Sequence, residues 1–366
     1  METREKIHLS FDDVNIVPKY SEIEHRGDCN TKTFITKSYY LHFPIVSAPM
    51  DTVTEHEMAI ALWAYGGLGF IHRFASIEDQ VNEVGSVSDY IHNFKFSSNI
   101  WDTDKQWLEN PPIGAAIGVT GDYIERAYEL VKNGANILLI DVAHGHHILV
   151  KNALTALHNQ QFVHNVEFIA GNIATIPAAQ DLMSWGVHGL RVGLGNGSLC
   201  ETRIRTGVGI PQISTLSAID SIVDGKVPII GDGGCRMIGD ICKALIAGAD
   251  TVMLGSLLAG TRETPGRILR IGNWPGEKLY KKYWGTASLE SKIQRNEDEK
   301  NVEGNSKLIP YKGKVKRILK DIKDGLTSSM SYIGVSNIYD YKSKAELIRV
   351  TPSSYIEGLP HLMLGE

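Results

Sequence analysis

The sequence predicts an α/β protein folded as a closed (β/α)8 TIM barrel, and two observations support this fold class. Eight short apolar runs rich in β-branched residues alternate with longer segments of helical periodicity. Polar or glycine-rich sequences follow nearly every run, at the strand ends where barrels place their active sites. An open, doubly wound sheet is the alternative, because it is built from the same βα repeat.

The predicted strands are almost continuously apolar, as parallel strands buried on both faces should be. They span residues 44–48, 67–71, 113–119, 136–141, 166–171, 189–194, 227–232 and 250–255. The sequences at their carboxyl ends are SAPMDT, IHR, DVAHG, GN, GLGNGSLC, GDGG and LGS. A site built from these loops would lie at one end of the barrel.

Composition and charge exclude several classes of protein. The 366 residues carry 37 basic and 42 acidic side chains, so there is no basic field for nucleic acid. The N-terminus has no apolar signal region, and the most apolar stretch, 245–260, is too short to cross a bilayer. Four cysteines without metal-binding or CxxC spacing favour a reducing compartment. We therefore expect a cytoplasmic protein with no membrane or nucleic-acid partner.

One barrel domain over residues 1–366 accounts for the chain, with an N-terminal extension over about 1–40. Residues 290–307, after the eighth unit, are dense in charge and poor in large apolar side chains. Such an insertion at the mouth of a barrel is typical of a mobile lid or binding loop. The predicted lid covers about 286–312.

Cys200 is the candidate nucleophile. It lies in the glycine-rich sequence GLGNGSLCETR, after the sixth predicted strand. The glycines remove side chains where a ligand must approach the backbone, and the nearby Arg203 and Arg205 would favour a thiolate. The other cysteines, Cys29, Cys235 and Cys242, are interpreted as buried and inert.

Two glycine loops after the seventh and eighth predicted strands indicate a phosphorylated substrate. They are Gly231-Asp232-Gly233-Gly234 and Leu254-Gly255-Ser256. Backbone N–H groups in this pair of barrel loops commonly bind phosphate. Asp232 would repel a phosphate, but its carboxylate can accept hydrogen bonds from a ribose diol. Together these loops predict a nucleotide.

The sequence Asp141-Val142-Ala143-His144-Gly145-His146-His147 contains three histidines, but no further spaced ligand that would complete a metal site. Asp141 is better suited to orient a cofactor ribose or amide. Asn172, at the end of the next strand, can donate a hydrogen bond to a base or a carboxamide.

Five motifs, in order along the chain, resemble signatures of the IMP dehydrogenase and GMP reductase family. They are LSFDDV at 9–14, SAPMDTV at 47–53, GSLCETR at 197–203, GDGG at 231–234 and YWGTAS at 283–288. The resemblance covers essentially the whole chain. It implies a (β/α)8 barrel, assembly as a homotetramer and a purine nucleoside monophosphate as substrate.

The resemblance also implies roles for individual residues. Cys200 would attack C2 of the purine to form a thioimidate, while a nicotinamide cofactor carries hydride. The carbonyls of Gly195, Gly197 and Cys200 would bind a monovalent cation, K+ in most relatives. Cofactor contacts are implied for Arg73, Asp141, Val142, Ala143, Asn172 and Gly193. Substrate contacts are implied for Ser47, Met50, Ser198, Asp232, Gly233, Gly234, Gly255, Ser256, Tyr283, Gly285, Thr286, Ala287 and Gly304.

Within the family, the lid favours GMP reductase. Dehydrogenases activate water with an Arg-Tyr pair, whereas Arg295 here has no adjacent tyrosine. Reductases deaminate with a threonine and a lid glutamate, which Thr202 and Glu303 match. Residues 75–112 are too few for the regulatory CBS modules of most dehydrogenases. The predicted activity is NADPH-dependent reductive deamination of GMP to IMP and ammonia.

Other features resemble dehydrogenases, so oxidation of IMP to XMP with NAD is the alternative, with water activated by a residue such as Arg295. SAPMDTV is closer to the dehydrogenase version of that loop, Thr286 replaces a typical reductase methionine, and the 357–361 tail is also dehydrogenase-like. More distant alternatives are a catalytically silent nucleotide sensor and a flavin-dependent barrel oxidoreductase.

Overall fold

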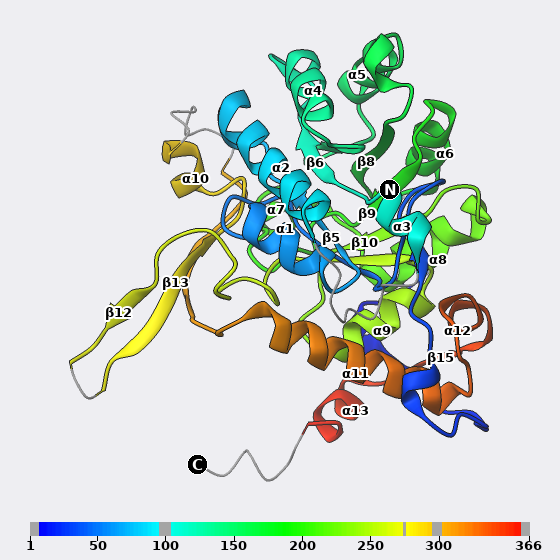
Figure 1. Cartoon of the computed structure of the whole chain (residues 1–366). Coiled ribbons are helices and arrows are strands. Elements are labelled where there is room, and N and C mark those ends of the chain that lie inside the picture. The colour runs from blue at the N-terminus through cyan, green and yellow to red at the C-terminus, as the bar shows by residue number, and fades with distance from the viewer. Residues whose placement is uncertain (1–6, 95–103, 274–275, 295–301, 360–366) are drawn as a thin grey trace.

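The computed structural model describes residues 7–94, 104–273, 276–294 and 302–359. Its centre is a closed barrel of eight parallel strands in the order β10-β11-β4-β5-β6-β7-β8-β9 (Figure 1). Closure confirms the predicted (β/α)8 barrel and excludes the open doubly wound sheet, which would leave two unpaired edges. The barrel strands are β4 (Ile45–Ser47), β5 (Leu68–Ile71), β6 (Gly114–Ile117), β7 (Ile137–Asp141), β8 (Glu167–Ile173), β9 (Gly189–Val192), β10 (Ile229–Asp232) and β11 (Thr251–Leu254).

A helix follows each barrel strand and packs on the outside of the barrel (Figure 1). The last of the eight, α11, comes after a long excursion of the chain and packs against α9 and α1. The eight are α1 (His56–Trp63), α2 (Ile77–His92), α4 (Tyr123–Lys132), α5 (Ile148–His158), α6 (Ile176–Ser184), α8 (Gln212–Val223), α9 (Ile238–Ile246) and α11 (Val315–Ile333). Shorter helices are α3 (Lys105–Glu109), α7 (Thr202–Thr206), α10 (Leu289–Gln294), α12 (Ile338–Lys344) and α13 (Pro352–Glu357).

The N-terminal segment closes one end of the barrel. Its hairpin, β2 (Thr33–Phe34) and β3 (Tyr40–Leu41), packs apolar side chains against inward-facing strand residues such as Phe70. The hairpin meets the amino ends of the strands, where the Thr33 hydroxyl donates to the Asp250 carbonyl at 3.0 Å. The carboxyl ends of the strands, where the site is predicted, lie at the opposite end.

The two ends of the chain are paired with each other. Strand β1 (Val14–Ile16) runs antiparallel to β15 (Leu347–Arg349). A 3-10 turn, Phe11–Asp13, leads into β1 and buries the Phe11 ring in the main core. The N-terminal extension is therefore packed against the barrel and the C-terminal segment.

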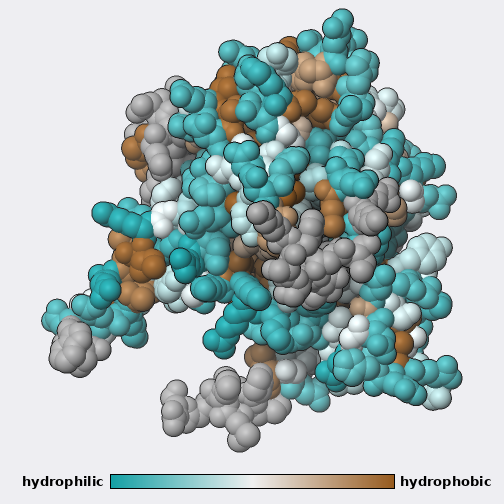
Figure 2. Space-filling model, viewed as in Figure 1, coloured by the Kyte–Doolittle hydropathy of each residue, from teal (hydrophilic) through white to brown (hydrophobic). Residues whose placement is uncertain are grey.

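An antiparallel sheet that the sequence did not predict projects from the barrel (Figure 1). Its strands are β12 (Leu269–Ile271), β13 (Lys278–Trp284) and β14 (Ser306–Pro310). Part of the expected lid is therefore regular structure, in α10 and β14. Residues 295–301, which include Arg295, lie outside the described part of the chain. Figure 2 shows hydrophobic residues on this arm, where Ile271, Leu279 and Leu308 are exposed.

Over the described residues, the longest helices lack the apolar length needed to cross a membrane.

Candidate active site

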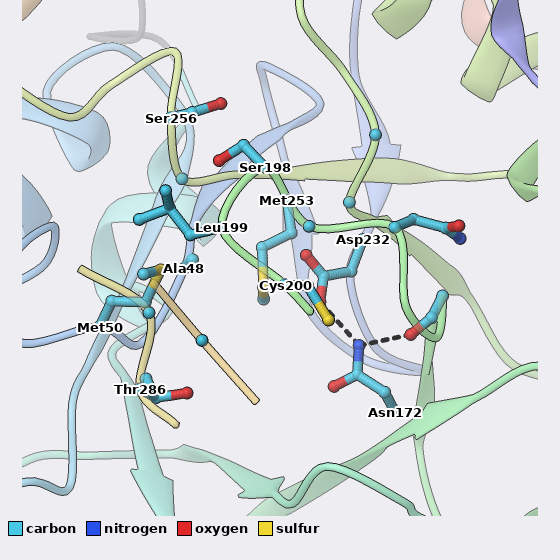
Figure 3. Close-up of a pocket in the computed structure, with 18 of the residues that line it drawn as sticks. Ala48, Met50, Asn172, Ser198, Leu199, Cys200, Asp232, Met253, Ser256 and Thr286 are labelled. Carbon is cyan, nitrogen blue, oxygen red and sulfur yellow. Dashed lines mark hydrogen bonds between the residues drawn. The ribbon is translucent and has the colours of Figure 1, made fainter. Parts of the chain in front are cut away.

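A cavity of about 420 Å³ opens at the carboxyl ends of the barrel strands. In the close-up, Cys200, Asp232 and Asn172 lie together on one side of it, and Met50 and Thr286 lie on the other (Figure 3). Most of the predicted site residues meet here. Those that line the cavity are Met50, Asp141, Ala143, Asn172, Gly193, Gly195, Gly197, Ser198, Cys200, Thr202, Asp232, Gly233, Gly234, Gly255, Ser256, Tyr283, Gly285, Thr286, Ala287, Glu303 and Gly304.

Three predicted site residues are not part of this lining. Ser47 is fully buried, and its Oγ accepts a 2.8 Å hydrogen bond from the Thr54 hydroxyl, so it supports the wall from behind. Val142 is also outside the lining. Arg73, after β5, reaches Asp141, with its Nε 3.6 Å from Oδ2 and 3.3 Å from the backbone carbonyl. Arg73 thus contacts the site through Asp141.

The thiol of Cys200 begins a short chain of hydrogen bonds. Its Sγ lies 3.1 Å from Thr202 Oγ1, which accepts from the thiol. The Thr202 hydroxyl donates in turn to Glu303 Oε2 at 2.8 Å. A thiol, a hydroxyl and a carboxylate in this order can pass a proton between the sulfur and the carboxylate.

Backbone pairing holds the two ends of this chain of hydrogen bonds together. Cys200 and Gly304 form an isolated antiparallel bridge. The Glu201 N–H donates to the Glu303 carbonyl at 2.8 Å, and the Asn305 N–H donates to the Leu199 carbonyl at 3.1 Å. The segment just before β14 therefore docks on the cysteine loop through its main chain, which fixes where the Glu303 side chain can reach.

The two arginines expected to favour a Cys200 thiolate have other partners. Arg205 in α7 forms an ion pair at 2.8 Å with Glu201, the residue that immediately precedes this helix. Arg203 donates from Nη2 to the Ile210 carbonyl at 2.7 Å. Both guanidinium groups are therefore engaged by groups other than the Cys200 thiol, although both arginines lie close to it in the sequence.

Ser198 and Ser256 lie at one end of the cavity (Figure 3), and the glycines of both loops, Gly233, Gly234 and Gly255, also line it. Gly233 and Gly234 have φ values of 91° and 88°, a conformation that L side chains rarely adopt. Tyr283 closes this end: its hydroxyl lies 3.2 Å from Ser198 Oγ, and its ring is buried. Burial raises the pKa of Tyr283, the hydrogen bond with Ser198 lowers it less, and the Asp232 charge raises it further. The phenol is therefore neutral and can donate a hydrogen bond to an anion.

Asp232 and Asn172 lie side by side, at the ends of β10 and β8. Asn172 Nδ2 donates to Asp232 Oδ2 at 2.7 Å and to the Gly193 carbonyl at 2.8 Å. Both amide hydrogens of Asn172 are thus used within the protein, and its carbonyl oxygen is the group left for a ligand. For Asn172 to donate a hydrogen bond to a ligand, one of its two hydrogen bonds, to Asp232 or to the Gly193 carbonyl, would have to break.

Sequence reasoning missed Arg191, which also lines the cavity. It lies in β9 and forms ion pairs with two predicted site residues, Asp141 at 2.5 Å and Asp232 at 2.9 Å. A signal was available, because a charged residue inside a buried strand requires partners. Asn196 and Arg236 line the cavity as well and were also missed.

Two of the histidines after β7, His146 and His147, form hydrogen bonds within the protein. His146 Nε2 lies 2.8 Å from an Asp181 carboxylate oxygen. Burial lowers the pKa of His144, and the neighbouring His146 and His147 lower it further. Within the described ranges, no group of three or more His, Cys, Asp or Glu side chains is placed to hold a metal ion.

The remaining cysteines are buried free thiols. Burial raises the pKa of Cys29, Cys235 and Cys242. Cys235 follows the Gly233-Gly234 loop and also lines the cavity. A thiol with a raised pKa is a poor nucleophile, so these three cysteines are poor candidates for that role.

The closed barrel and its cysteine-centred cavity define an α/β-barrel enzyme. The model of the IMP dehydrogenase / GMP reductase domain matches residues 8–361, and the chain belongs to this family. Its named relatives are oxidoreductases, and the chain is an enzyme of that class.

Both activities of the family occur among similar proteins. The chain is 37% identical to inosine-5'-monophosphate dehydrogenase of Borreliella burgdorferi over 397 residues, covering 96% of each chain. It is 31% identical to GMP reductase of Leishmania donovani over 478 residues, again covering 96% of each. A GMP reductase variant from Trypanosoma brucei, solved in complex with guanosine 5'-monophosphate, has a TM-score of 0.86 and 29% identity, covering 97% of this chain and 98% of its own.

Proposed function

We propose that this protein is a GMP reductase, which converts GMP, NADPH and two protons into IMP, ammonium and NADP+. The observation that carries the proposal is the chain of hydrogen bonds from Cys200 through Thr202 to Glu303, with separations of 3.1 and 2.8 Å. Deamination needs a group that takes a proton from the thiol and returns it to a leaving amine, and this arrangement is suited to that task.

The proposed reaction begins when Cys200 Sγ adds to C2 of the purine and its proton passes through Thr202 to Glu303. Glu303 then returns a proton through Thr202 to the amino group on C2, which leaves as ammonia and gives a thioimidate. The nicotinamide cofactor supplies hydride. Once C2 has accepted it, the C2–S bond breaks, the sulfur leaves with the bonding electrons, and IMP is released.

The proposed nucleotide position follows from charge and geometry. The base would stack near Met50 and Cys200, and the ribose diol would meet Asp232. The phosphate would meet the backbone N–H groups of the Gly233 and Ser256 loops, with the Tyr283 phenol as an added donor. The cofactor would enter beside Asp141, where the lining also includes Ala143.

A monovalent cation, K+ in the first instance, is proposed at the carbonyls of Gly195, Gly197 and Cys200. Neutral carbonyl oxygens are suitable ligands for such an ion. The Gly197 carbonyl accepts the Cys200 N–H at 3.1 Å and retains a second lone pair. The Arg203 side chain lies against Gly195. The ion would also need ligands from another segment. Its contribution would be to order the loop that carries Cys200.

IMP dehydrogenase is the second candidate, and sequence similarity favours it. Dehydrogenases of Borreliella burgdorferi and Cryptosporidium parvum are 37% and 36% identical to this chain, against 31% for the Leishmania donovani reductase. In this case IMP would be oxidised with NAD, and water would have to be activated without a tyrosine next to Arg295.

The absorbance of the reduced cofactor at 340 nm separates the two candidates. With GMP and NADPH, the proposal expects absorbance to fall while ammonia is released. If absorbance is steady there but rises with IMP, NAD and K+, the protein is a dehydrogenase. Nucleotide binding without turnover in either mixture would indicate a sensor. A homotetramer and a cytoplasmic location stay predictions.

A further inference from the structure

Arg191 occupies an unusual place for an arginine. It lies in barrel strand β9 between the fully buried Leu190 and Val192, and only 8% of its own surface is exposed. Removing a guanidinium from water costs several kcal/mol unless carboxylates and hydrogen bonds compensate for the lost hydration. A residue that adds such a cost inside a barrel strand must have its charge balanced by specific partners.

Those partners are two carboxylates, Asp141 at the end of β7 and Asp232 at the end of β10. Arg191 Nη1 donates to Asp141 Oδ1 at 2.5 Å, and its Nε donates to Asp232 Oδ2 at 2.9 Å. Burial alone lowers the pKa of Arg191, but the charges of Asp232 and Asp141 outweigh it, so the net pKa is raised. One fixed positive charge therefore stands between two negative charges.

Each carboxylate has a further partner on its far side. Asp232 Oδ2 also accepts from Asn172 at 2.7 Å, and Asp141 Oδ2 lies 3.6 Å from Arg73 Nε. Within the described ranges, Oδ2 accepts both hydrogen bonds to the Asp232 side chain, from Asn172 and from Arg191. Its Oδ1 is therefore the oxygen available to a ligand in the cavity. Positive and negative side chains therefore alternate in a row, in the order Arg73, Asp141, Arg191 and Asp232.

We propose that Arg191 is a positioning residue that couples nucleotide binding at Asp232 to cofactor binding at Asp141. This inference rests on the proposed function, which assigns these two carboxylates to different ligands. The guanidinium is planar and rigid, so Nε and Nη1 cannot adjust to their carboxylates independently. A ligand that fixes Asp232 also fixes Arg191, and through it Asp141. The second ligand then meets a carboxylate that is already ordered and binds more tightly.

Calorimetry with pairs of ligands that cannot complete the hydride transfer tests the coupling. GMP is titrated with and without saturating NADP+, and IMP with and without saturating NADH. For the wild-type protein we expect one ligand to tighten the other by about fivefold or more. Arg191→Lys keeps the positive charge but has one ammonium in place of the two-armed group. We expect this variant to bind each ligand alone. In this variant, one ligand should change the affinity for the other by no more than about twofold.

A buried arginine outside the cavity provides the matched control. Arg126 in α4 is also buried and forms an ion pair with Asp122 at 2.7 Å and a hydrogen bond with Gln80 at 2.7 Å. Arg126→Lys should lower the melting temperature without changing the coupling. A merely structural role for Arg191 predicts the same pattern for both variants.

Asp141→Asn serves if Arg191→Lys does not fold, because it weakens one end of the bridge without changing its size. It should lose the coupling whatever its affinity for the cofactor alone. The proposal is overturned if the wild-type protein shows no coupling with either pair, or if Arg191→Lys retains it. Coupling seen with IMP and NADH in a protein that does not reduce GMP would support Arg191 while rejecting the proposed reductase.

Discussion

Thr202 Oγ1 lies 2.8 Å from Glu303 Oε2, although the two residues are 101 positions apart in the sequence. Main-chain hydrogen bonds on both sides of Cys200 bring them together, because the segment around Gly304 pairs with the cysteine loop. The candidate proton path is thus assembled by backbone pairing and completed by side chains.

Glu303→Gln should lower kcat for GMP by about 100-fold or more, because an amide cannot accept the proton that the thiol releases. The protein should stay folded, since the main-chain pairing does not depend on the side chain. Steady-state rates at 340 nm measure the effect. Glu201→Gln is the matched control, because Glu201 is paired with Arg205 and is not part of the cavity lining. Equal rates for Glu303→Gln and the wild-type enzyme would reject the proposed mechanism.

Tyr283→Phe should raise KM for the nucleotide by about fivefold, equivalent to the roughly 1 kcal/mol that one hydrogen bond contributes. The variant removes the hydroxyl that lies 3.2 Å from Ser198 and would donate to phosphate. Tyr280→Phe, on the same strand but outside the cavity lining, should leave KM unchanged. Inhibition by guanosine, which lacks the phosphate, should be the same in both variants. A change with guanosine would place the contact elsewhere.

Gly193→Ala should destabilise the protein by about 3–5 kcal/mol. A Cβ at Gly193 would stand 1.9 Å from the Asp232 carbonyl oxygen, and the residue has a φ of 144°. Gly207→Ala is the comparison, because Gly207 has a φ of 74° but no atom within 4 Å of its added Cβ. That variant should lose only about 1 kcal/mol from backbone strain. Urea unfolding of both variants measures the difference, and equal losses would contradict the clash.

The buried His42 should make the folded protein less stable in acid. Burial lowers its pKa to about 4, an effect that the Asp104 carboxylate opposes and that Lys32 and Lys323 reinforce. The unfolded histidine has a pKa near 6.5, so between these values the unfolded chain binds a proton that the folded one does not. This stability is fully present above pH 6.5 and is lost as the pH falls toward 4.

Urea unfolding at pH 7, 6 and 5 measures this loss, which we expect to be about 2 kcal/mol over that range. His42→Gln should remove this part of the pH dependence while leaving the contributions of the other histidines. The assignment to His42 is contradicted if the variant loses stability with pH as steeply as the wild-type protein.

The barrel could be predicted because its strands are buried on both faces and are therefore continuously apolar, as 136–141 and 250–255 illustrate. The projecting arm could not. Lys278–Trp284 mixes lysines with aromatic side chains and has no regular alternation, and its partner Ser306–Pro310 comes more than twenty residues later, after a segment dense in charge. Strands that pair over such a distance have little local signal in the sequence.

Site residues at the ends of strands were predictable because loop sequences such as GDGG have an unusual composition. Arg191 was missed because it lies within a strand, whereas the sequence signals that predicted the site lie in loops. The arginines next to Cys200 showed the opposite error, since nearness in sequence was taken for contact. Only the fold reveals that Arg205 faces Glu201, whereas Arg191 faces the cavity.

The pairing of β1 with β15 has a consequence for limited proteolysis. Cleavage before Leu347 would remove the partner of β1, and the segment leading into that strand carries Phe11. The Phe11 ring lies directly against Gly234, within 2.9 Å of where a Cβ would stand. A cut near the C-terminus would therefore loosen the support of a glycine loop far away in the sequence. Nucleotide should in turn protect the C-terminal segment from digestion.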